Sequence, residues 1–318
     1  MISKQESSIL KAVAIFSIIM SHFWGWICPC GEILEVIGGS FAQSGVFLFL
    51  FLSGYGIMHS YQEKGLGHFW FRRLSKIYIP FLMVSIPQLV LAVWKYRNNI
   101  GEMYITSTFL SAVGLYPNNL LDGTLWFIPF ILMQYLWFYI SFKVGKNSIT
   151  QKTLVIALTF VGYCIFKMKF TWARDNDIYG LAFLLGAIYA EKEKGIKRID
   201  KKKICCLGVL SMGVYIITLM GFHYAVPRFI NGFFLAMLEI LVIKLLKIYL
   251  KFGFLDKIGE YSYELYLTEG IFFGNTILYD LVGYNHWGLL LHLLVIGVLA
   301  MGIQWLTMAT NKRLYRKG

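Results

Sequence analysis

Long apolar segments recur along the whole chain, and they predict a bundle of membrane-spanning helices. A helix needs roughly 20 predominantly apolar residues to cross the hydrocarbon core of a bilayer. We predict ten such segments, although several are short for a full crossing, at residues 8–27, 41–60, 77–94, 123–142, 153–166, 178–190, 204–222, 229–250, 258–279 and 287–309. The predicted fold class is an all-α polytopic membrane protein with about ten transmembrane helices.

The ends of the apolar pattern bear on domain organisation. The first run, from Ser8 to Ile27, is longer than the core of a signal peptide and no small-residue cleavage site follows it, so we expect it to be retained. The segment from Met103 to Leu120 is ambiguous and can be re-entrant or interfacial. No linker or internal repeat is evident, so residues 1–318 are expected to form a single transmembrane domain without an appended soluble domain.

Composition and charge support this prediction and orient the helices. The chain has 318 residues, of which 58% are hydrophobic and 15% charged, whereas a soluble domain has about 25% charged residues. The net charge of +13 does not indicate nucleic-acid binding here, because Lys and Arg collect on the cytoplasmic side of membrane proteins. With the N-terminus inside, most of the 30 Lys and Arg residues fall on that side. We therefore expect cytoplasmic termini and a multi-pass protein of the inner (plasma) membrane.

Two ionisable residues, Lys11 and His22, interrupt the first apolar segment. Eleven residues make close to three helical turns, so both side chains lie on one stripe, about 16 Å apart along the axis. Lys11 can simply snorkel to the interface, and His22 can bond to a neighbouring helix. Ionisable groups at membrane depth are costly and usually line a cavity or a bundle interior, and a neutral imidazole is a natural general base for a hydroxyl. We take His22, with Lys11, as the candidate catalytic residues.

A basic cluster precedes the third apolar segment, in the sequence "FWFRRLSKIYIP". It consists of Arg72, Arg73 and Lys76. Positive charge at this position is typical of cytoplasmic anchoring. Guanidinium groups also bind phosphate oxygens bidentately, and a lysine adds a point charge. The cluster is therefore a candidate phosphate-binding site.

Acidic and aromatic residues provide candidates for substrate contacts. Asp122 and Trp126 open the fourth segment near the predicted outer surface, where aromatics form interfacial belts but also stack on sugars. Glu239 lies in the middle of a segment, which marks a functional carboxylate or an ion pair between helices. The ninth segment carries Glu264 and Glu269. We list Asp122, Trp126, Glu239 and Glu269 as candidate substrate-binding residues.

The other polar positions predict no further chemistry. The glycines of Ser53-Gly54-x-Gly56 are typical of close helix packing. The charged stretch from Glu191 to Lys203 is predicted to be a solvated cytoplasmic loop. No metal site is predicted, because the five cysteines and the remaining histidines lack ligand spacing. Those histidines are His59, His68, His223, His286 and His292.

Taken in order, these features resemble acyltransferase family 3 of integral membrane proteins. The resemblance rests on Lys11 followed by His22, on "FLFLSGYGI" in the second segment, on the arginine-rich entry to the third, on "GTLWFI" from Gly123 to Ile128, and on "IGEYSYELYL" near the C-terminus. Two positions depart from the family pattern. The R-x-x-R signature falls on Arg73 and Lys76, with lysine in the second place, and Glu269 stands near a position that is often histidine.

The resemblance implies a function and a set of partners. Members of the family transfer acyl groups, commonly acetyl, from cytoplasmic acyl-CoA to hydroxyls of extracytoplasmic carbohydrates. In bacteria the acceptors include capsule, exopolysaccharide, O-antigen and peptidoglycan, free or as lipid-linked glycans. No permanently bound cofactor is implied, since acyl-CoA is a substrate, and neither is a nucleic acid.

This resemblance leads to a mechanistic hypothesis with several alternatives. The phosphates of acyl-CoA dock on the basic cluster and Lys11, and the thioester reaches towards His22. His22 then acts as general base on the sugar hydroxyl, or accepts the acyl group itself. A transporter or flippase of a lipid-linked sugar is the rival class, and a non-catalytic assembly partner is a third.

Overall fold

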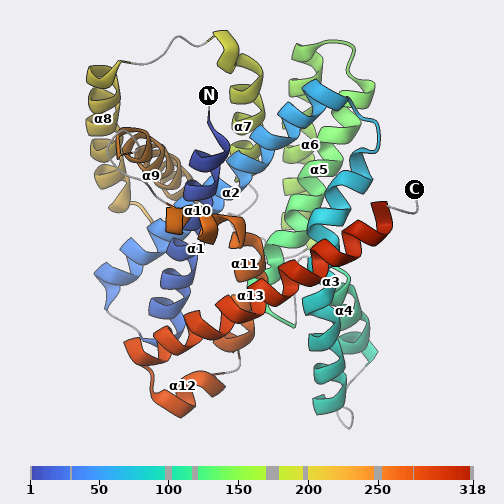
Figure 1. Cartoon of the computed structure of the whole chain (residues 1–318). Coiled ribbons are helices and arrows are strands. Elements are labelled where there is room, and N and C mark those ends of the chain that lie inside the picture. The colour runs from blue at the N-terminus through green and yellow to red at the C-terminus, as the bar shows by residue number, and fades with distance from the viewer. Residues whose placement is uncertain are drawn as a thin grey trace. The chain divides into compact units, whose positions relative to one another are not determined.

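The computed structural model describes residues 2–28, 31–96, 102–116, 121–169, 179–195, 200–246, 253–274 and 276–315 (Figure 1). Within these ranges every regular element is a helix, so the all-α prediction is confirmed. Seven of the described helices are long and apolar enough to cross a membrane. Their spans are Lys4–Ile27, Glu32–Lys64, Phe69–Trp94, Gly123–Val144, Lys201–Leu219, Val226–Leu246 and His286–Arg313.

The chain divides into two compact units. The first unit comprises Met1–Leu66 and Trp137–Ser262, and the second comprises Gly67–Leu136 and Tyr263–Gly318. The first contains α1 (Lys4–His22), η1 (Phe23–Ile27), α2 (Glu32–Lys64), α6 (Ser148–Lys169), α7 (Gly180–Lys192), η4 (Glu193–Gly195), α8 (Lys201–Leu219), α9 (Ala225–Leu246) and α10 (Gly253–Glu260). The second contains α3 (Phe69–Tyr96), α4 (Glu102–Ala112), η2 (Gly123–Trp126), most of α11 (Ser262–Gly274), α12 (Ile277–Val282) and α13 (His286–Tyr315), and the boundary falls within α5 (Phe127–Val144).

The remaining predicted segments are helical but shorter or broken. Residues 153–166 lie within α6. Of the predicted segment 178–190, residues 180–190 lie in α7, which has 13 residues, and residue 178 lies outside the described part. The single helix expected over 258–279 is wrong, because this stretch is divided among α10, α11 and α12. Ser262 begins α11 and Thr276 precedes α12. Hydroxyl residues favour helix starts because their side chains compete for backbone hydrogen bonds.

The ambiguous segment after α3 forms a short helix. α4 has 11 residues, about 16 Å at the rise of an α-helix, which is too short to cross a bilayer. The end of this segment is fixed on α3, since the Tyr78 hydroxyl donates to the Val113 carbonyl at 2.8 Å and Ser85 Oγ to the Ala112 carbonyl at 2.7 Å. Residues 117–120 of the predicted segment lie outside the described part.

Small residues bring the helices of the first unit into backbone contact. A Cβ added at Gly54 of α2 would overlap the Phe183 carbonyl of α7, and one at Gly186 of α7 would overlap the Phe51 carbonyl of α2. Gly56, by contrast, has open space. Close approach of this kind maximises dispersion contacts between helices where no water drives association. The packing interpretation of the motif is thus confirmed for Gly54.

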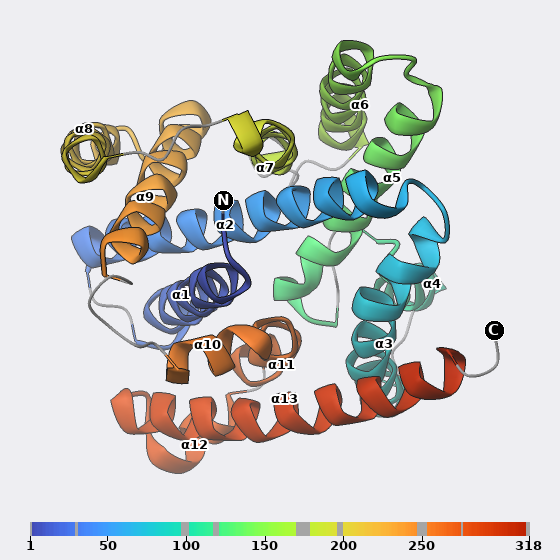
Figure 2. The same ribbon diagram turned by 45° about the horizontal axis from the view of Figure 1, so that its top comes forward.

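Helices α8 and α9 lie side by side, and α9 also packs against α2 (Figure 2). A buried polar network joins these three helices at Asn231. Its carboxamide oxygen accepts from Ser40 Oγ at 2.5 Å, and its amide donates to the Tyr215 carbonyl and to Thr218 Oγ1 at 3.0 and 3.1 Å. Asn231 and Ser40 are both fully buried. Interhelical hydrogen bonds of this kind specify which helix faces meet in an apolar solvent.

The second unit is organised around α3, which contains Pro80 and Pro87. Proline removes a backbone donor and kinks a helix, and side-chain donors from other helices can bond to backbone carbonyls near the kink. The Tyr263 hydroxyl of α11 donates to the Ile77 carbonyl at 2.7 Å, and Asn311 of α13 donates to the Ser75 carbonyl at 3.2 Å. These two bonds hold α11 and α13 against α3.

Candidate functional site

Helix α1 carries both candidate catalytic residues. It starts at a capping box, in which Ser3 Oγ accepts from the Glu6 amide at 3.2 Å and Glu6 accepts from the Ser3 amide at 2.6 Å. Lys11 and His22 both lie in this one unbroken α-helix, so their predicted position on one stripe is confirmed. Each is half-buried.

His22 is the last residue of α1, and a π-helical turn, η1, follows it. Turns of this kind widen the helix locally and are common at functional sites. The imidazole of His22 stacks on the Trp26 indole, with ring centroids 4.5 Å apart and planes 9° from parallel. The indole therefore fixes the plane of the imidazole.

The rotation of α1 is set by contacts on both sides of Lys11. On α2, a Cβ added at Gly45 would lie 2.7 Å from the Ala14 carbonyl. On α10, Gly259 abuts the Ser8 carbonyl, and Ser8 Oγ donates to the Asp256 carbonyl at 2.6 Å. Backbone contacts leave little room for α1 to turn, so Lys11 and His22 are held at fixed positions.

Glu239 of α9 lies beside this helix pair. Its Oε1 accepts from Ser44 Oγ at 3.1 Å, and among the described residues its buried Oε2 has no hydrogen-bond partner. Ser44 precedes Gly45, which packs on α1 between the levels of Lys11 and His22. The first unit thus brings the Glu239 carboxyl to the stretch of α1 that separates the two candidate catalytic residues.

The basic cluster lies on the first turns of α3 in the second unit, where its three members differ in environment. Arg72 donates to the Gly67 carbonyl, and the Arg73 guanidinium lies over the Tyr135 ring at 5.9 Å from the centroid. Lys76 is exposed. Both arginines are half-buried, and the Tyr135 ring orients the Arg73 guanidinium. Two of the three cations of the cluster are therefore held by contacts, and the third is exposed.

Asp122 and Glu269 lie close together in the second unit, and both are buried. Asp122 Oδ1 caps η2 by accepting from the Thr124 amide at 2.9 Å and its hydroxyl at 2.8 Å. A Cβ added at Gly270, the residue after Glu269, would overlap this carboxylate. Tyr266, one turn earlier on α11, donates to the Thr124 carbonyl at 2.8 Å.

This arrangement is a buried acidic cluster formed by the "GTLW" turn and α11. The Tyr266 hydroxyl bonds to the same turn that Asp122 caps. Trp126 is half-buried and packs on Phe127 and Phe130, with centroids 6.0 and 5.9 Å away. Asp122 is buried, and its carboxylate caps the turn.

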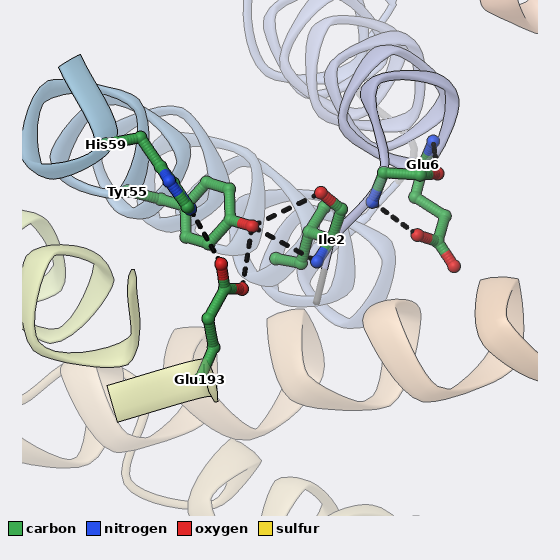
Figure 3. Close-up of polar contacts among 6 residues, drawn as sticks. Ile2, Glu6, Tyr55, His59 and Glu193 are labelled. Atoms are coloured by element: carbon green, nitrogen blue, oxygen red, sulfur yellow. Dashed lines mark hydrogen bonds and ion pairs between the residues drawn. The ribbon is translucent and has the colours of Figure 1, made fainter. Parts of the chain in front are cut away.

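Sequence reasoning missed a buried carboxylate near the start of the chain's charged loop. Glu193 was predicted to be solvated, but its side chain is completely buried. Its oxygens lie 2.8 Å from the Tyr55 hydroxyl and 2.8 Å from His59 Nε2 (Figure 3). The same hydroxyl lies 3.2 Å from both the amide and the carbonyl of Ile2. The solvated interpretation is wrong here because η4 turns Glu193 inward on to α2.

Glu193→Ala is expected to destabilise the protein, because it leaves Tyr55 and His59 without their buried acceptor. Hydrogen bonds to charged groups contribute about 1.5–3 kcal/mol each, so we expect a clear fall in the thermal midpoint of the detergent-purified protein.

Glu191→Ala is the matched control. Glu191 is partly exposed and bonds to Ser148 at 2.6 Å and to Lys152. Burial disfavours its ionisation, but these bonds outweigh burial and lower its pKa. A surface pair of this kind contributes at most about 1 kcal/mol. Equal effects of the two changes would contradict this assignment.

Comparisons with known proteins agree with the sequence motifs. Residues 6–309 match the family model of acyltransferase family 3, which is described as an acyltransferase domain. The match covers nearly the whole chain and runs through both units, so the protein belongs to this acyltransferase family. Its apolar helices make it a multi-pass membrane protein. No curated protein and no solved structure matches the chain.

In the described part of the chain, no group of three or more His, Cys, Asp or Glu side chains is placed to share a metal ion. The chemistry available is that of an imidazole, several carboxyl groups and clustered cations.

Proposed function

We propose that this protein is a membrane O-acyltransferase of the inner (plasma) membrane. It moves an acyl group, most simply acetyl, from cytoplasmic acyl-CoA to a hydroxyl of an extracytoplasmic carbohydrate such as capsule, exopolysaccharide or O-antigen. Membership of the acyltransferase family supports the reaction class. The observation that carries the proposal is the position of Lys11 and His22 on one stripe of a single apolar helix.

In the proposed reaction His22 acts as general base. It takes the proton of the sugar hydroxyl as the oxygen attacks the thioester carbonyl, and the CoA thiolate leaves and recovers that proton. In the acyl-enzyme variant, one imidazole nitrogen attacks the thioester carbonyl, and CoA leaves as a thiolate that takes the proton from the other ring nitrogen. The sugar hydroxyl then attacks the acyl-imidazole, and its proton returns to the released ring. Stacking on Trp26 orients the ring in both variants. Labelled acyl-CoA without acceptor distinguishes the two variants, because only the acyl-enzyme variant labels the protein covalently.

The remaining candidates have roles in binding. The basic cluster on α3 holds the phosphates of CoA, and the acidic cluster of Asp122 and Glu269 binds acceptor hydroxyls, with Trp126 as an aromatic surface for a sugar ring. Glu239 lies between the levels of Lys11 and His22, where its carboxyl can accept amide hydrogens of the pantetheine arm. Each of these roles is part of the proposal and follows from the chemistry of the groups.

A direct assay tests the proposed function. Purified protein in detergent or vesicles is given labelled acetyl-CoA and a carbohydrate acceptor, and labelled product and free CoA are measured. Equimolar appearance of both supports an acyltransferase. Movement of a lipid-linked sugar across vesicles without CoA consumption would instead establish the transporter alternative.

Arg73→Ala and Lys76→Ala are each expected to raise the half-saturation concentration for acetyl-CoA by roughly 10-fold to 100-fold. The reason is that charge-assisted bonds to phosphate contribute about 1.5–3 kcal/mol. Half-saturation for the acceptor should change little. Lys76→Arg restores the R-x-x-R signature and should tighten donor binding, since an arginine binds phosphate bidentately.

Lys143→Ala is the control for these variants. Lys143 is an exposed cation at the end of α5, on the same predicted side of the membrane. It should leave donor kinetics unchanged. If Arg73→Ala and Lys76→Ala behave like this control, the basic cluster serves only as a membrane anchor.

A further inference from the structure

A buried Tyr–His pair joins α12 to α13 in the second unit. The hydroxyl of Tyr279 lies 2.7 Å from His292 Nδ1, and both residues are completely buried. His292 stands two turns into α13, within a span that is apolar enough to cross a membrane. The sequence pattern gave it no role, because it has no polar neighbour along its own helix.

The imidazole of His292 also contacts α11. Its ring centroid lies 4.3 Å from that of Phe273 and 5.8 Å from that of Phe272, and the Phe273 ring also stacks on Tyr279 at 6.3 Å. His292 thus bonds to α12 and packs on α11 at Phe272 and Phe273, within one turn of Glu269.

That turn of α11 also carries part of the acidic cluster. Gly270 packs so closely on Asp122 that a Cβ there would overlap its carboxylate, and Tyr266 bonds to the Thr124 carbonyl. A shift of α11 along or about its axis would therefore change the spacing of the Asp122 and Glu269 carboxyl groups. The contacts of His292 lie on the same turn of the helix, within four residues of Glu269.

A purely structural role would not require this chemistry. A buried imidazole in a membrane helix is costly, and a leucine of similar volume would fill the space among Phe272, Phe273 and Tyr279 without polar atoms. A hydrogen bond differs from apolar packing in that it has direction. The bond between Tyr279 and His292 therefore fixes α12 against α13, and the His292 ring packs from there on Phe273 of α11.

We propose that Tyr279 and His292 are positioning residues for the acceptor site. Together they fix the Glu269–Phe273 turn of α11 and so set the geometry of the Asp122 and Glu269 carboxyl groups that receive the carbohydrate. That the carboxyl groups receive a carbohydrate rests on the proposed function, whereas the positioning of α11 by Tyr279 and His292 does not. Neither residue touches the reacting atoms.

Kinetics of purified variants test the kinetic part of the inference. Tyr279→Phe and His292→Ala should raise the half-saturation concentration for the acceptor by about 10-fold, because small misplacements of positioning groups have effects of this order or larger. The half-saturation concentration for acetyl-CoA should not change. His292→Asn retains an acceptor near the position of Nδ1 and should restore most of the loss seen with His292→Ala.

Two matched controls lie on the same segment. Tyr284→Phe removes an exposed hydroxyl that bonds only within its own turn, to Asp280. His286→Ala removes an exposed imidazole from the start of α13. Both should retain wild-type kinetics for donor and acceptor.

Hydrogen–deuterium exchange separates failure of this inference from failure of the proposed function. Tyr279→Phe should speed exchange of the amides of Glu269 to Phe273 and leave α1 unchanged, whether or not the protein transfers acyl groups. If wild-type protein shows no transfer but the exchange change occurs, the proposed function fails and the positioning of α11 stands. Unchanged exchange, or equal changes in donor and acceptor half-saturation, would overturn the inference.

Discussion

His22→Ala is expected to lower the rate of acyl transfer by roughly 10²-fold to 10⁴-fold, the usual contribution of a general base. The physical reason is that a sugar hydroxyl is a weak nucleophile until a base takes its proton. The loss should appear in the turnover rate at saturating donor and acceptor. Membrane insertion and the thermal midpoint should remain close to wild type, because contacts at Ser8, Ala14 and Ile18 hold α1 in place.

The control for this prediction is His223→Ala. His223 is exposed and lies outside the candidate site, so its loss should leave transfer unchanged. A Trp26→Ala variant adds a graded test, since it keeps the imidazole but removes the ring that stacks on it. It should reduce turnover less than His22→Ala. Near wild-type transfer by normally inserted His22→Ala protein would refute the catalytic assignment.

We expect acyl transfer only when donor and acceptor are on opposite faces of the bilayer and each is on its own face. The distribution of Lys and Arg predicts that the termini and the basic cluster lie on the cytoplasmic face. Acyl-CoA is too highly charged to cross unaided, so its phosphates should stay on that face while the acyl group passes to the acceptor. Vesicles with protein in one orientation should therefore make product only when donor is on the terminal-bearing face and acceptor on the opposite face.

The reverse arrangement and a one-sided arrangement complete this experiment. Exchanging donor and acceptor should abolish transfer, and permeabilising the vesicles should restore it. The orientation of the protein is verified independently by protease cleavage at the C-terminal end. Equal transfer with both substrates confined to the terminal-bearing face would rule out the trans-membrane reaction, even for a protein that proves to be an acyltransferase.

The sequence by itself determined the helical class, most of the long apolar helices and the family. Hydrophobic periodicity is local, and a run of some 20 apolar residues can satisfy its backbone in lipid only as a helix. Helical periodicity likewise predicted that Lys11 and His22 lie on one stripe, because both are in a single helix. The motifs around Gly54 and Gly123 then led to the family, which the match over residues 6–309 confirms.

Only the tertiary structure decided which polar side chains are buried together. Glu193 lies in a stretch of charged residues, and nothing local shows that it turns inward to Tyr55 and His59. Tyr279 and His292 are 13 residues apart on different helices, so no helical period relates them. The break of segment 258–279 into three helices likewise accompanies the contact of Gly259 with α1. Such pairings depend on how helix faces meet, and an apolar pattern specifies that a face is buried but not what lies against it.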